Sequence, residues 1–112
     1  MGIEDAGVID AVGTEHSTGV EILTIVDAWD WSDERAHLLA LQDKLNAYLE
    51  FIESGHLLEE RPHAAGRPCR IDVLSRHPFP GHLVPFLEEA RRVAATYGVE
   101  LEQHDLGAIG NA

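Results

Sequence analysis

One long amphipathic helical pattern constrains the fold more than any other feature of the sequence. Between Ser32 and Ser54, apolar side chains recur at steps of three and four residues, which places them on one face of a helix. They are Leu38, Leu41, Leu45, Tyr48, Leu49 and Ile52. Gly55 follows as a C-terminal stop signal. Because such a helix has a single apolar face, another layer of structure must cover it.

The other periodic segments predict that this second layer is a β-sheet. Runs rich in Val, Ile and Thr predict strands near residues 8–15 and 20–28, joined by a short hairpin link. Alternation in "CRIDVLSR" predicts a third strand, and "VELEQHDL" a fourth. A second helix is predicted from Leu83 to Tyr97, and residues 56–68 are expected to be irregular. The order β-β-α-β-α-β predicts an α+β two-layer sandwich, with a four-stranded sheet and two helices on one face.

Length and composition predict one soluble domain. The 112 residues fit a single α+β domain over 1–112, with a loose tail at about 106–112. No apolar run approaches the roughly 20 residues that a membrane helix needs. The opening "MGIEDAGVID" lacks the basic and apolar regions of a signal peptide, and a single cysteine excludes an intramolecular disulfide. We therefore expect a cytoplasmic protein that does not bind membranes.

The charge of the chain restricts its partners. The net charge of −12 argues against nucleic acid, because binding phosphates requires Lys and Arg. Residues 1–34 hold nine acids and no Lys or Arg, whereas six arginines lie between Arg61 and Arg92. Two interpretations stay open: a solvated acidic surface that maintains solubility, or a surface that pairs with a second copy or docks a basic or apolar protein partner.

Two segments, "LTIVDAWDW" and "LQDKLNAYLEFIESG", carry a resemblance to a known family. Over about Ile3 to Gln103 the chain resembles a family of small, uncharacterised bacterial proteins that is described as a domain of unknown function. The segments Val26–Trp31 and Leu41–Gly55 are the most distinctive parts of the resemblance. It implies a single domain and supplies no catalytic residues.

A group of acids and one histidine stands at the start of the long helix: Asp27, Asp30, Asp33, Glu34 and His37. Helix capping explains most of them, with Asp30 or Ser32 as N-cap and acids in the first turn facing the helix dipole. The alternative is a small metal-binding protein or hydrolase that uses Asp30, Glu34 and His37, with His37 as a general base. The Glu-x-x-His spacing occurs once, whereas di-iron bundles need it twice.

Familiar catalytic motifs are missing from the sequence. There is no Gly-x-Ser-x-Gly, no P-loop, no dinucleotide fingerprint and no His-Glu-x-x-His. Cys69 shares strand parity with Ile71 and Val73, which favours a small buried side chain over a nucleophile paired with His63 or His77. We expect no catalytic residue, no metal ligand and no cofactor, and a regulatory or inhibitor-like binding module in place of an enzyme.

The strand near 20–28 is apolar on both faces at its middle, which predicts an interaction surface. If Ile22 and Val26 face the helices, alternate residues point to the uncovered face of the sheet. The predicted surface comprises Leu23, Ile25, Trp29, Trp31 and Leu74. An exposed apolar sheet face with an aromatic rim is typical of an association surface, and we expect a homodimer. The competing interpretation is a well-covered central strand, with one tryptophan packed under the long helix.

Overall fold

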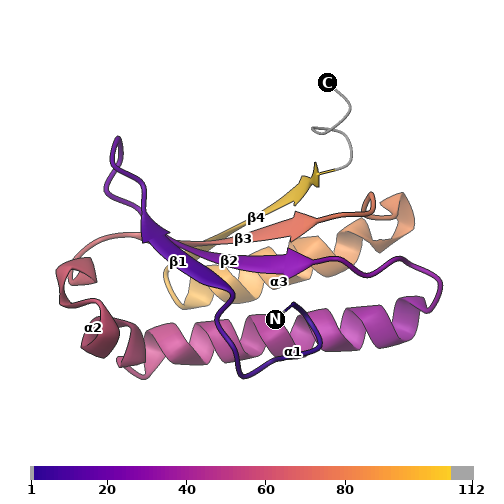
Figure 1. Cartoon of the computed structure of the whole chain (residues 1–112). Coiled ribbons are helices and arrows are strands. Elements are labelled where there is room, and N and C mark those ends of the chain that lie inside the picture. The colour runs from indigo at the N-terminus through magenta and orange to yellow at the C-terminus, as the bar shows by residue number, and fades with distance from the viewer. Residues whose placement is uncertain (1, 107–112) are drawn as a thin grey trace.

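A mixed four-stranded sheet forms one side of the molecule. The computed structural model describes residues 2–106. Strands β1 (Ala11–Thr14), β2 (Glu21–Asp27), β3 (Cys69–Ser75) and β4 (Val99–Asp105) lie in the order β1-β2-β3-β4 (Figure 1). Strand β1 is antiparallel to β2, whereas β2, β3 and β4 are parallel. The carboxyl ends of three neighbouring strands therefore meet at one edge of the sheet.

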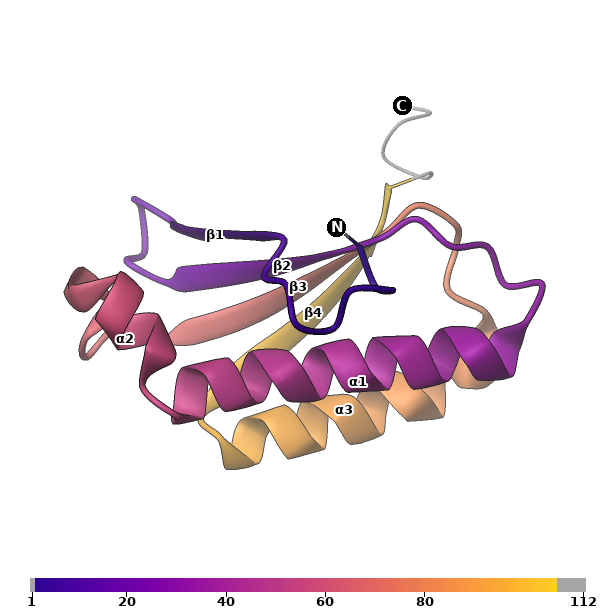
Figure 2. The ribbon, with the colours of Figure 1, turned by 60° about the horizontal axis from the view of Figure 1, so that its bottom comes forward.

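The helices lie on one side of this sheet. Helix α1 (Glu34–Glu53) connects β2 to β3 and is followed by the short α2 (His56–Glu60) and the 3-10 turn η1 (Pro62–Ala64). The turn η2 (Gly81–Leu83) leads into α3 (Val84–Thr96), which connects β3 to β4. Figure 2 shows α1 and α3 side by side under the same face of the sheet. We call the opposite face, which no helix of residues 2–106 covers, the outer face.

The core lies between the sheet and the two long helices. Alternate residues of β2 and β3 point into it, with Leu23, Ile25, Ile71 and Val73 fully buried. Helix α1 supplies the face that its spacing predicts, and its buried apolar side chains are Leu41, Leu45, Tyr48 and Leu49. The apolar pattern of α1 and the strand alternation of β3 therefore meet in one continuous core.

The predicted α+β class and four-stranded sheet are confirmed. The structure adds a third helix, α2, within residues 56–68, which the sequence predicts to be irregular. Its buried Leu57 gives that segment an apolar anchor, and Pro62 begins the turn that ends it. The loose tail expected at about 106–112 lies, apart from Leu106, outside the described residues.

The predicted orientation of β2 is wrong. Leu23 and Ile25 point into the core, so Ile22 and Val26 lie on the outer face. The reason is that two acids share the inward side of β2. Glu21 and Asp27 are buried at its two ends, so the polar residues that would ordinarily mark the solvent side mark the core side instead.

A buried lysine fixes the segment that precedes β1. The ammonium of Lys44 is inaccessible to solvent and donates to the carbonyls of Gly2 and Asp5 and to the Asp10 carboxylate, at 2.8, 2.8 and 2.9 Å. Burial raises the pKa of the Tyr48 hydroxyl to about 12, and that hydroxyl donates to the Thr24 carbonyl. These polar contacts hold the amino-terminal segment against α1 and β2.

Candidate functional site

The acids at the start of α1 form a cap and a turn. Asp33 is the N-cap, and its carboxylate accepts from the Ala36 amide at 3.1 Å. The sequence predicts Asp30 or Ser32 as the N-cap, and the observed N-cap lies one position after Ser32. Asp30 instead accepts from the amide and the hydroxyl of Ser32, and these bonds lower the pKa of the Asp30 carboxyl. Glu34 occupies the first turn, where the helix dipole favours a negative charge.

His37 is buried and uses both ring nitrogens. Its Nε2 lies 2.5 Å from Oδ2 of Asp27, and its Nδ1 lies 2.9 Å from the Asp30 carbonyl oxygen. The carbonyl can only accept, so Nδ1 carries a proton. With one nitrogen donating to the backbone and the other engaged by a carboxylate, neither is open to a metal ion or a substrate. The imidazole instead joins the end of β2 to the first turn of α1.

The two tryptophans surround this histidine. Trp31 stacks on the imidazole with ring centroids 3.5 Å apart, and Trp29 meets it edge-on at 5.7 Å. Trp31 also meets Phe79 edge-on, and the Trp29 indole donates to Glu4. The expectation that these rings extend the apolar sheet face is therefore corrected: they enclose His37 at the carboxyl end of the sheet.

The predicted polar site does not converge on one point. Glu34 turns outward to an exposed ion pair with His82 at 3.0 Å, while the ring of His37 is directed to Asp27. The side chain of Asp30 is engaged by Ser32. The side chains of Asp30, Glu34 and His37 are thus directed to the different side chains of Ser32, His82 and Asp27, and the arrangement lacks the shared open position that a catalytic metal or a general base requires.

A second buried carboxylate lies at the other end of β2. Glu21 accepts from Nε of Arg61 at 2.7 Å and from the Thr14 hydroxyl, and His63 lies 3.5 Å away. The hydrogen bond from Arg61 holds the pKa of Glu21 below its ordinary value, although burial opposes that shift. This ion pair ties the connection after α2 to the first residue of β2.

The outer face has a neutral half and a charged half. Its neutral half lies on β1 and β2, with Ala11, Gly13, Ile22, Thr24 and Val26. Val26 is directly opposite Leu74 of β3, and the two side chains line a shallow hollow together with Asp27, Ala28, Arg76 and Leu106. We call Ile22, Val26 and Leu74 the outer apolar strip. Of the predicted interaction residues, Leu74 is the one that lies on this face.

The charged half of the outer face lies on β3 and β4. Arg70 donates to Asp72 at 2.8 Å and lies 3.6 Å from Glu102, and these acids raise the pKa of its guanidinium. Asp72, Glu102 and His104 offer ligand atoms within 4.8 Å of one another, as a metal site would. The Arg70 guanidinium pairs with Asp72 and lies near Glu102, so it competes with a metal ion for these carboxylates.

Comparison with known proteins identifies a family. A sequence model of DUF6572, a family of unknown function, matches residues 1–106 of the chain. The chain belongs to this family. The match bears out the resemblance carried by the segments Val26–Trp31 and Leu41–Gly55. Neither the curated proteins nor the solved structures contain a match.

The sequence of this DUF6572 chain does not reveal the strand register that brings the charged residues of the outer face together. Strand alternation places Glu102 and His104 on one face of β4, and Asp72 on the corresponding face of β3. Only the parallel register, in which Asp72 lies opposite Glu102, brings the three side chains together. The order of the parallel strands cannot be deduced from their alternation.

Among residues 2–106, no helix has both the length and the apolar character that crossing a membrane requires.

Proposed function

We propose that this DUF6572 protein is a non-enzymatic binding module of the cytosol, which forms a homodimer through its outer face. The observation that carries the proposal is the cross-strand pair of Val26 and Leu74 on a face that no described helix covers. Apolar side chains paired across strands favour burial against a second surface. The molecule is then a two-layer sandwich, and a second copy would cover the sheet face that lies opposite its helices.

The distribution of charge supports a second copy as the partner. A two-fold axis brings the same patch of each subunit together. The neutral half of one outer face then packs on the neutral half of the other, at about the 10 Å spacing of stacked sheets. The charged half, where Arg70 pairs with Asp72 and lies near Glu102, then falls at the hydrated rim. An apolar centre with a polar rim is the common anatomy of an interface.

The competing hypothesis, a metal binder or hydrolase at the start of α1, gains no support from the geometry. Both ring nitrogens of His37 have partners, and Glu34 points to His82. The buried pair of His37 and Asp27 instead stabilises the turn between β2 and α1.

Methyl NMR in the presence of a soluble nitroxide tests which face is covered. In a concentrated sample the methyl signals of Val26 and Leu74 should resist broadening, and they should lose this protection on dilution as the dimer dissociates. The methyl groups of Leu39, an exposed residue of α1, serve as the control and should broaden at every concentration. Equal broadening of Val26, Leu74 and Leu39 in the concentrated sample would contradict the proposal.

A further inference from the structure

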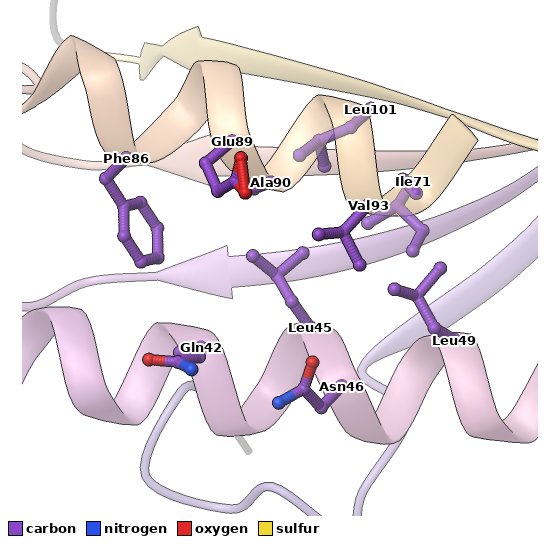
Figure 3. Close-up of a pocket in the computed structure, with 11 residues that line it drawn as sticks. Gln42, Leu45, Asn46, Leu49, Ile71, Phe86, Glu89, Ala90, Val93 and Leu101 are labelled. Atoms are coloured by element: carbon purple, nitrogen blue, oxygen red, sulfur yellow. The ribbon is translucent and has the colours of Figure 1, made fainter. Parts of the chain in front are cut away.

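A cavity of about 200 Å³ lies between α1 and α3, on the helix side of the sheet and away from the proposed dimer face. Its walls are Leu45 and Leu49 of α1 and Phe86 and Val93 of α3, as Figure 3 shows. It reaches down to Ile71 of the sheet. The volume is below the roughly 300–1,000 Å³ of pockets for drug-sized ligands, so it suits a short acyl chain or a single ring.

Small residues on α3 leave this space open. Ala90 lines the cavity, where a longer apolar side chain would fill the space between the helices. The cavity is partly open to solvent, so its apolar walls are exposed to water. An apolar ligand would displace this water and cover the walls, which is favourable.

Two carboxamides stand at the mouth of the cavity. Gln42 and Asn46 are one turn apart on α1, and neither side chain makes a hydrogen bond with any residue in the range 2–106. Across the mouth, the Glu89 carboxylate is engaged by Arg92 at 2.5 and 2.8 Å. The rim thus offers amide donors and acceptors that have no partner, beside a carboxylate whose charge is already compensated.

We propose that this cavity binds a small uncharged amphipathic molecule, with a short acyl or aryl group between the helices and an amide-like head group on Gln42 and Asn46. Carboxamides both donate and accept, so they complement a neutral polar head. An anionic head is disfavoured, since the chain carries a net charge of −12 and none of the described residues that line the cavity is a Lys or Arg.

Titration with hexanamide, followed by the backbone amide signals of the ¹⁵N-labelled protein, tests the site. We expect saturable shifts at Leu45, Leu49 and Val93, and at least about tenfold weaker binding of hexanoate. Shifts that do not saturate, or that map elsewhere, would overturn the proposal. Equal affinity for hexanoate would overturn the uncharged head group.

Three variants separate occupation of the cavity from general effects on folding. Ala90→Leu should fill the space and abolish hexanamide binding while keeping or raising the melting temperature. Ala95→Leu makes the same change at an exposed position of α3 that does not line the cavity, and should bind as the wild type does. The exposed Gln42→Leu should weaken binding by about three- to tenfold without unfolding the protein. Undiminished binding by Ala90→Leu or by Gln42→Leu contradicts the assignment.

Discussion

The imidazole Nε2 of His37 lies 2.5 Å from Oδ2 of Asp27, and both side chains are almost completely buried. Ten residues separate them in sequence, so the contact closes the turn that leads from β2 into α1. Trp31 covers the ring by stacking on it. The sequence leaves His37 open as a general base. In the structure, its side chain instead links the end of β2 to the residues that precede α1.

Breaking this pair should be strongly destabilising. His37→Ala leaves the Asp27 carboxylate buried without its ion-pair partner, although the Trp29 amide still donates to it, and we expect a loss of about 3–5 kcal/mol in the free energy of unfolding. Urea denaturation measures the loss. Glu34→Gln is the matched control, because its ion pair with His82 is exposed and contributes little. If His37→Ala left the free energy of unfolding unchanged, the contact would not contribute to stability.

Lys44 should be the most sensitive polar position of α1. Lys44→Met removes the cation that faces Asp10 and the carbonyls of Gly2 and Asp5, and we expect a loss of about 3–5 kcal/mol. Limited proteolysis should then cut within residues 2–10 faster than it does in the wild type. Adding Asp10→Asn should recover part of the loss, because the buried charge is removed while the side-chain oxygen still accepts from Val26. A double variant as unstable as Lys44→Met would contradict the pairing.

Glu21 should make the protein sensitive to acid. Its pKa lies below the ordinary 4.5 in the folded state, chiefly because of the hydrogen bond from Arg61. A carboxyl whose pKa is lower in the folded than in the unfolded state stabilises the fold at pH values above its unfolded-state pKa. This contribution is lost as the pH falls through the folded-state pKa. Melting temperatures between pH 6 and pH 3 should therefore decline less steeply in Glu21→Gln than in the wild type. Parallel declines would assign the acid sensitivity to other carboxyls.

From the sequence, the positions of the helices and strands can be predicted better than the face of each strand that is buried. The apolar spacing of α1 and the alternation of β3 identify both elements, because their polar residues, apart from the buried His37, Lys44 and Ser75, lie outside the core. The buried face of β2 is predicted wrongly because the two acids at its ends are buried with partners that lie outside the strand. Glu21 pairs with Arg61, and Asp27 pairs with His37.

The candidate sites were harder to predict because they depend on long-range contacts. No local pattern marks Lys44 as buried, since its partners precede it by 34 to 42 residues. The proximity of Asp72 to Glu102 depends on strand order, and the cavity under Ala90 depends on how α1 and α3 lie over the sheet. Tertiary placement, which periodicity does not encode, decides each of these features.

Sedimentation equilibrium of Val26→Asp tests the proposed dimer most directly. The wild type should sediment at twice the 12.3 kDa of one chain, and Val26→Asp should dissociate at least about tenfold more readily, since symmetry brings two new carboxylates into one interface. Leu39→Asp, the same change at an exposed position of α1, should leave the dimer intact. Circular dichroism should show that both variants are folded. A wild type that stays monomeric at high micromolar concentration, or a folded Val26→Asp that dimerises as the wild type does, would contradict the account.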